Sequence, residues 1–129
     1  MVGYAAAQDE VRADHEITRS GAQLLAAWEG FIEECSDGYS WDISEYQNEI
    51  RIRDQIEVLI GSDRLRAFDD HADFCAQVQA LDDKFKALAH STWKFPEAKS
   101  WWSQVVPRAA GEDFAGYCQQ VYGFAVDEV

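Results

Sequence analysis

The spacing of His71 and Cys75 is the first feature of this sequence that could support chemistry. The two residues are four positions apart, so on a helix they would share one face. Acidic oxygen ligands lie nearby at Asp69, Asp70 and Asp73. A zinc or iron site needs three or four ligands that converge from several elements. A buried, hydrogen-bonded His71 is therefore the expected state, and a small enzyme or metal-binding helical protein that uses His71 and Cys75 is kept as an alternative function.

Sequence motifs of catalysis are absent. Nucleophilic catalysis pairs a serine or cysteine with a base, but neither a GxSxG turn nor a recognised cysteine signature occurs. The GxxxxGK phosphate loop is also missing. Carboxylates are numerous, but a hydrolase needs two of them in one cleft with separated pKa values. We therefore expect no enzymatic activity, no catalytic residue, no metal ligand and no cofactor.

Binding of a basic surface is the chemistry that residues 29–49 favour. This segment, EGFIEECSDGYSWDISEYQNE, holds seven acidic residues, four aromatic residues and no lysine or arginine. Clustered acids accelerate the encounter with a basic partner. Tryptophan and tyrosine are enriched among the side chains that dominate interface energetics. The predicted partner-binding residues are Glu33, Glu34, Asp37, Tyr39, Trp41, Asp42, Glu45 and Glu49.

Within this set, the acids are expected to steer and pair with the partner, while Tyr39 and Trp41 anchor it from an exposed turn. The competing interpretation is a solvated acidic face with half-packed tyrosines. Asp42 and Glu45 also have the spacing of a helix capping box, so these two acids have a structural alternative.

The charge of the whole chain restricts the partner. The sequence has 24 acidic and 11 basic residues, a net charge of −13. Nucleic acids and acidic membranes attract basic surfaces, so direct binding to either is not expected. Solubility alone is the simplest reason for such charge. Toxin-immunity proteins and nuclease inhibitors are a class of small acidic proteins that block basic grooves. The leading prediction is therefore a non-enzymatic bacterial inhibitor of a basic toxin or nuclease.

The segment WKFPEAKSWW gathers a second set of large rings, Trp93, Phe95, Trp101 and Trp102. Residues 84–111 carry five basic residues and one acid, a balance of +4, whereas residues 1–50 have 11 acids and two basic residues, a balance of −9. The rings are expected to close the end of a helical core beneath lysine stems. The opposite charges leave a third alternative, a self-associating structural protein or homo-oligomer that assembles head to tail.

The length and composition predict one all-α domain over residues 1–129, with the N-terminal residues and the tail 125–129 as mobile ends. Cys35, Cys75 and Cys118 are widely spaced, so free thiols in a reducing cytoplasm are expected. No apolar run is long enough to span a membrane, and the N-terminus does not resemble a signal peptide.

Hydrophobic periodicity predicts an irregular bundle of about four to six helices. A helix is expected from Ile17 to Cys35, ended by Gly38, and a short helix from Ile43 joined irregularly at 48–51 to a second one ending at Ile60. A strand over 50–60 is the alternative. Ser62 should cap a long helix that reaches about His90. A short helix between Pro96 and Pro107 and a last helix over 112–122 complete the prediction.

Overall fold

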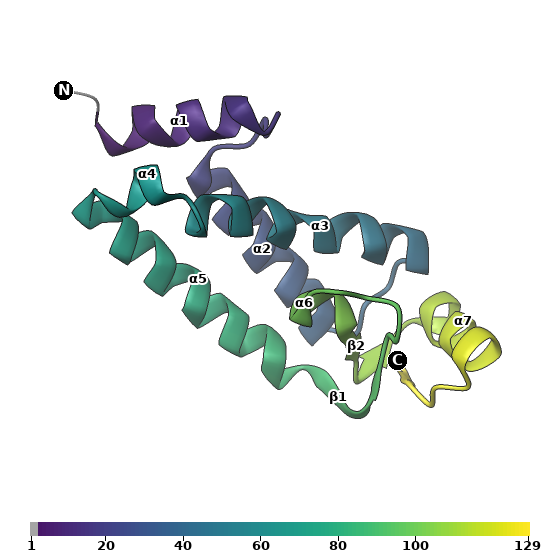
Figure 1. Cartoon of the computed structure of the whole chain (residues 1–129). Helices are drawn as coiled ribbons and strands as arrows, with labels where there is room; N and C mark the ends of the chain where they lie inside the picture. The colour runs from purple at the N-terminus through teal and green to yellow at the C-terminus, as the bar shows by residue number, and fades with distance from the viewer. Residues whose placement is uncertain (1–2) are drawn as a thin grey trace.

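The chain forms a helical bundle in which the helices are joined by short turns and two small sheets (Figure 1). The computed structural model describes residues 3–129. The helices are α1 (Tyr4–Asp14), α2 (Gly21–Ser36), α3 (Ile43–Ile60), α4 (Asp63–Arg66), α5 (Asp69–Ala87), α6 (Trp101–Gln104) and α7 (Glu112–Tyr122). The strands are β1 (Ala89–Lys94), β2 (Val105–Pro107), β3 (Ala109–Ala110) and β4 (Asp127–Glu128). The predicted all-α fold class is confirmed.

Helix α2 lies at the centre of the bundle because it packs against both α3 and α5. Its apolar face buries Leu24, Trp28 and Phe31, the stripe that the sequence predicts. The Trp28 ring stacks on Phe31 at 5.6 Å between centroids and meets Phe85 of α5 edge-on at 5.0 Å. These aromatic contacts add to the burial of apolar area and fix the order of the three long helices.

The start of α2 differs from the prediction. The helix begins at Gly21, not at Ile17, because Ser20 accepts a hydrogen bond from the Gln23 amide and Gln23 closes a capping box. Ile17 is buried, but it belongs to the turn before the helix. A Cβ on Gly21 would lie 2.7 Å from Oε1 of Gln8, so the end of the Gln8 side chain occupies the space beside this glycine.

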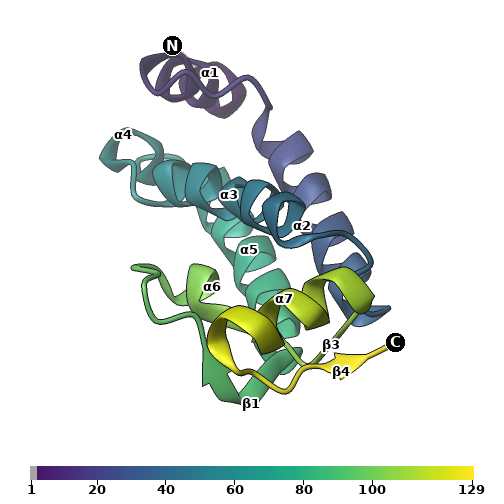
Figure 2. The ribbon, with the colours of Figure 1, turned by 90° about the vertical axis from the view of Figure 1, so that its right-hand side faces the viewer.

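Helix α1 occupies the N-terminal segment, where the sequence predicted no helix. Residues 4–14 are helical and bury Ala7 and Val11 in the common core. The helix packs on α3 and α4 at the end of the bundle opposite β3 and β4 (Figures 1 and 2). Its apolar residues are few and mostly alanine, so its periodicity was too weak to predict the helix.

Helix α3 is continuous from Ile43 to Ile60, so the predicted joint at 48–51 and the alternative strand are both wrong. The direction of its apolar face turns along the helix because its neighbours change. α3 contacts α2 but also α1, α6 and α7. Tyr46, for example, lies 5.0 Å from the ring of Phe114 on α7. An apolar stripe that rotates is therefore buried without a break in the helix.

The predicted helix from Ser62 to about His90 is two helices. Ser62 caps α4 by accepting from the Leu65 amide, as expected. The chain then turns at Ala67 and Phe68 before α5 starts at Asp69 and ends at Ala87. Leu65 is fully buried, and its position under α1 explains why this short helix leaves the axis of α5.

The segment after α5 departs furthest from the prediction. Residues 89–94 form β1, which pairs antiparallel with β2, and Pro96 lies in the following loop instead of opening a helix. Pro107 lies buried in β2. Helix α7 spans the predicted residues 112–122 and ends at Gly123 with φ 72°. Within the C-terminal tail, β4 pairs parallel with β3.

A buried ion pair fastens α3 to α5. Arg53 donates from Nε and Nη2 to the two carboxylate oxygens of Asp82 at 2.9 and 3.0 Å, and both residues are 4% exposed. Trp28 Nε1 donates to the same carboxylate at 3.1 Å. The Arg53 guanidinium lies 4.5 Å from the ring centroid of Trp102. Trp102 is buried and Trp101 is half-buried, and the planes of the two indoles are 89° apart.

Candidate partner-binding site

The acidic turn connects α2 to α3 through residues 37–42, and its shape follows from its sequence. Asp37 is the C-cap of α2, and Gly38 reverses the chain with φ 89°, a conformation that favours glycine. Tyr39 then makes an isolated parallel bridge with Ala110. Asp42 ends the turn as the N-cap of α3, where it accepts from the Glu45 amide at 2.9 Å. The turn is therefore held at both ends.

Trp41 is the side chain that this turn presents to solvent. It is 55% exposed, among the most exposed large apolar side chains in residues 3–129. The acidic residues Glu33, Asp37, Asp42 and Glu45 are exposed as well. We call Trp41 and these four acids the acidic turn surface. An exposed indole on a turn flanked by exposed acids combines an apolar anchor with long-range attraction for a basic partner.

Tyr39 does not belong to this surface, and the expectation that it is exposed is wrong. It is fully buried, with its ring 5.2 Å from Tyr46 and 5.8 Å from Phe114. Its hydroxyl donates to Glu49 Oε2 at 2.7 Å. Burial, followed by the nearby Glu49 carboxylate, raises the pKa of Tyr39 far above its usual range. The pairing of Tyr39 with Ala110 draws the ring into the core, a contact that sequence spacing does not reveal.

Glu34 and Glu49 were predicted as exposed contacts but are half-buried where α2 and α3 meet. Oε2 of Glu34 is buried without a hydrogen-bond partner. Burial is the main cause that raises the pKa of Glu34, and the Glu49 carboxylate raises it further. Two carboxylates that face each other at a helix interface favour a proton or a cation between them.

These two acids line an open groove of about 740 Å³ between α2 and α3. Gly30 lines the groove, and a Cβ placed on it would meet no atom within 4 Å. Arg19 and Arg51 also line it, together with Glu45. The sequence did not predict this groove. The acidic residues of α2 and α3 are visible in the sequence. They lie beside each other only because the two helices pack together, and the sequence does not show that packing.

His71, which the alternative interpretation treats as a metal ligand or catalytic residue, is held in the core by hydrogen bonds. His71 is buried, and its Nε2 lies 3.3 Å from the Ile60 carbonyl, which can only accept a hydrogen bond. Nε2 therefore carries the proton, and Nδ1 accepts from the Tyr4 hydroxyl at 2.7 Å. Both ring nitrogens are thus engaged by the protein, as expected for a core histidine. Among residues 3–129, no group of three or more histidine, cysteine and acidic side chains is placed to hold a metal ion.

The three cysteines are free thiols in the structure. Cys35 and Cys118 are buried, and burial raises the pKa of Cys118 to about 11. Cys75 is half-buried, and burial raises its pKa as well. Thiols with raised pKa values carry little thiolate and are poor nucleophiles at neutral pH.

Comparison of the chain with protein-family models, with curated proteins and with solved structures gave no match. In the part of the chain that the structure describes, no helix has the length and apolar character needed to cross a membrane.

Proposed function

We propose that this protein is a non-enzymatic inhibitor that binds a basic protein, of the toxin-immunity or nuclease-inhibitor type. The observation that carries the proposal is Trp41, which is 55% exposed on a turn whose neighbouring acids are exposed too. Burying such an indole at an interface removes its apolar area from water, and the surrounding acids select a basic partner over an acidic one.

The α2–α3 groove supports the same function. The unpartnered Oε2 of Glu34 lies beside Glu49, and no cation among residues 3–129 is ion-paired with either carboxylate. A lysine or arginine side chain of the partner, placed in the groove, would supply the missing donor. It would also lower the pKa of Glu34, because a nearby positive charge favours the ionised carboxylate.

Inhibition follows from where a basic toxin or nuclease carries its charge. The substrates of nucleases are polyanions, so their active grooves are basic. A folded acidic surface that occupies such a groove competes directly with the nucleic acid. Exposed carboxylates on the turn and half-buried carboxylates in the groove would provide that competition without any catalytic step by this chain.

The first test is affinity capture with three forms of the protein, followed by mass spectrometry. The variants are Trp41→Ala and the charge-reversal pair Glu33→Lys/Asp37→Lys. The matched control is Asp73→Lys/Asp83→Lys, which changes the total charge equally on exposed residues of α5. We expect the wild type and the control to capture the same basic protein, and both turn variants to lose it.

The second test is titration with the purified partner. Loss of an interface tryptophan typically weakens binding by about 2 kcal/mol or more, so Trp41→Ala should weaken it about 30-fold or more. Raising the salt concentration should weaken the wild type more than the Glu33→Lys/Asp37→Lys variant. Equal affinity of all variants would show that the site is wrong, and capture of no basic protein would show that the function is wrong.

A further inference from the structure

The basic residues between 84 and 108 lack acidic partners within the described part of the chain. Of the basic residues before this segment, Arg12, Arg53, Arg64 and Arg66 form ion pairs with other described residues, whereas Arg19 and Arg51 do not. In residues 3–129, none of the five basic side chains between 84 and 108 lies within ion-pair distance of a carboxylate; they are Lys84, Lys86, Lys94, Lys99 and Arg108. In a chain with 24 acids, a basic segment without internal partners is available to an external anionic group.

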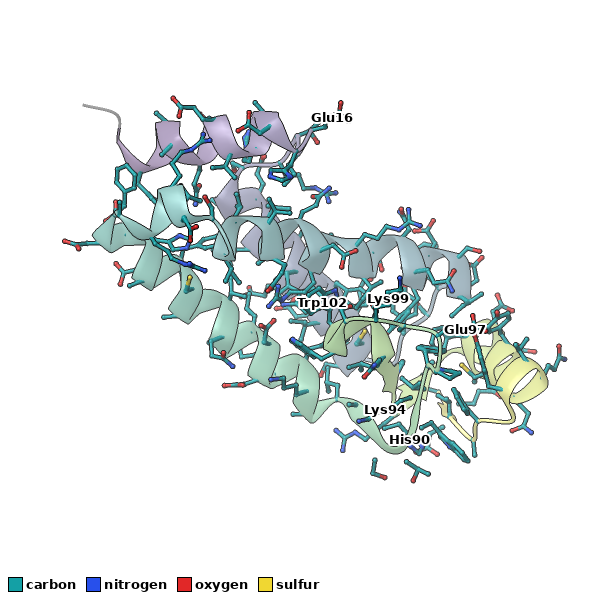
Figure 3. The ribbon with its side chains drawn as sticks, viewed as in Figure 1. Glu16, His90, Lys94, Glu97, Lys99 and Trp102 are labelled. Carbon is teal, nitrogen blue, oxygen red and sulfur yellow. The ribbon has the colours of Figure 1, made fainter. Side chains whose placement is uncertain are left out.

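Two of these lysines border a small cleft between the end of α5, β1 and α6. The cleft is lined by Lys86, Ala89, His90, Trp93, Lys94, Trp101, Gln104 and Val105, and no acidic side chain is among them. Figure 3 shows His90 and Lys94 together at the β1 end of the molecule. We call this the tryptophan cleft. Its walls are two indoles, and its charged groups are all basic.

The groups that line the tryptophan cleft are held in place. Lys86 Nζ lies 4.6 Å from the ring centroid of Trp101, a cation–π contact, and Trp93 stacks on Phe124 at 5.1 Å. The backbone amides of Thr92 and Trp93 both donate to Nδ1 of His90. The neutral His90 ring therefore carries its proton on Nε2, which remains available as a donor.

The size of the cleft restricts what it can accept. Its volume is about 220 Å³, whereas sites for drug-sized ligands and cofactors usually measure about 300–1,000 Å³. A single aromatic side chain with carboxylates beside it matches the volume, the indole walls and the basic charge. The acidic turn surface of this same chain has that chemistry, an exposed Trp41 between Asp37 and Asp42.

We propose that the tryptophan cleft of one copy binds the acidic turn surface of a second copy, with Trp41 inserted between the indoles. None of the residues that line the cleft comes from the turn, so the contact joins two molecules. The contact is heterologous, because each copy uses two different surfaces. Self-association through Trp41 would make the turn inaccessible to other partners. It is independent of the proposed inhibitory function, because it needs no second protein.

Electrostatics sets the conditions under which association is expected. Two copies of charge −13 repel each other as whole molecules. At about 0.15 M ionic strength the Debye length is about 8 Å, so this long-range repulsion is largely screened while close contacts between lysines and carboxylates persist. Association should therefore appear at physiological salt and high protein concentration, and should weaken at about 1 M salt.

Sedimentation equilibrium of the full chain tests the proposal. We expect the wild type to exceed the monomer mass as its concentration rises into the millimolar range. Trp41→Ala should weaken association about 30-fold or more. Lys86→Glu/Lys94→Glu should weaken it as well, so that each variant alone is a monomer at these concentrations. The matched control Lys84→Glu/Lys99→Glu has the same charge change outside the cleft lining and should associate more strongly than the cleft variant.

Mixing the two defective variants gives the decisive result. The Trp41→Ala chain retains an intact cleft, and the Lys86→Glu/Lys94→Glu chain retains an intact turn. A heterologous contact predicts that each variant alone is a monomer while the mixture forms a one-to-one dimer, which also shows that both variants are folded. A monomeric wild type, association that survives both variants, or a mixture that stays monomeric would overturn the proposal.

Discussion

At the residue scale, the most consequential side chain is Asp82, which satisfies Arg53 and Trp28 together in the core. Burial alone would lower the pKa of Arg53, but the hydrogen bonds to Asp82 and Glu57 raise it, so the guanidinium stays charged. Arg53 and Asp82 are each only 4% exposed, so removing one of them leaves the charge of the other poorly solvated.

Asp82→Ala should therefore destabilise the fold by about 3 kcal/mol, because it leaves the buried Arg53 with only the exposed Glu57 carboxylate as a partner. The measurement is urea unfolding followed by tryptophan fluorescence. Asp83→Ala is the matched control, since Asp83 is exposed and should change stability by about 0.5 kcal/mol or less. Equal unfolding midpoints for the two variants would contradict this role of Asp82.

Glu34 gives a prediction for pH. Its folded-state pKa is raised above 4.5, so the folded protein holds this proton more tightly than the unfolded chain. The resulting stabilisation is present below the unfolded pKa and is lost as the pH rises through the folded pKa. At neutral pH the ionised Glu34 therefore lowers stability.

Glu34→Gln removes this effect, and it should raise the Tm at neutral pH. The gain should shrink as the pH falls through the raised folded pKa and should be absent below about 4.5, where Glu34 is protonated in both the folded and the unfolded wild type. Thermal unfolding across the acidic range measures it, with Glu33→Gln as the exposed neighbour for comparison. A gain in Tm that does not depend on pH would mean that packing, and not the ionisation of Glu34, causes the difference in Tm between the variant and the wild type.

At the scale of elements, the turn between α2 and α3 depends on one backbone conformation. Gly38 has φ 89°, and the side chain of Val129 packs where its Cβ would lie. The turn therefore ties the C-terminal residues to the end of α2, and it sets the position from which Trp41 is exposed.

Gly38→Ala should destabilise the protein by about 1–2 kcal/mol because the left-handed conformation is costly for a residue with a Cβ. Gly30→Ala provides the opposite control. Gly30 lies inside α2 with open space around its Cβ position, so alanine should stabilise the helix by about 0.5–1 kcal/mol. Chemical unfolding of both variants would reveal the difference in sign, and a stabilising Gly38→Ala would contradict the strained turn.

At the scale of the whole molecule, charge acts against compactness. The chain has 24 acidic and 11 basic residues, and the exposed ion pairs of Arg12, Arg64 and Arg66 are each worth little. Self-repulsion should therefore outweigh attraction between surface charges.

The Tm should accordingly rise when NaCl is added to about 0.15 M, since the Debye length shortens to about 8 Å. Differential scanning calorimetry at dilute protein measures the rise. The Asp73→Lys/Asp83→Lys variant carries less net negative charge, so its Tm should rise less. A Tm that falls with salt would indicate that attractive surface pairs dominate.

The local signals in the sequence were sufficient for the fold class and for several helix boundaries. Ser62 and Asp42 cap helices where predicted, Gly38 stops α2, and α7 spans its predicted residues. These features depend on side-chain hydrogen bonds and backbone preferences within a few residues. Trp41 was likewise predicted to be exposed, because it sits in a turn and matches no helical apolar stripe.

The tertiary structure alone decided the features that depend on distant neighbours. The β1–β2 pair was not predicted because the partners of residues 89–94 lie beyond the intervening loop, and the helix predicted between Pro96 and Pro107 is reduced to the four residues of α6. Tyr39 is buried in the core because its backbone pairs with Ala110, a residue distant in sequence. Glu34 lies beside Glu49 because α2 packs on α3. Composition determined that this chain is acidic, helical and rich in aromatic residues. Which acids and rings reach the surface was decided by packing, because burial depends on contacts between segments far apart in sequence.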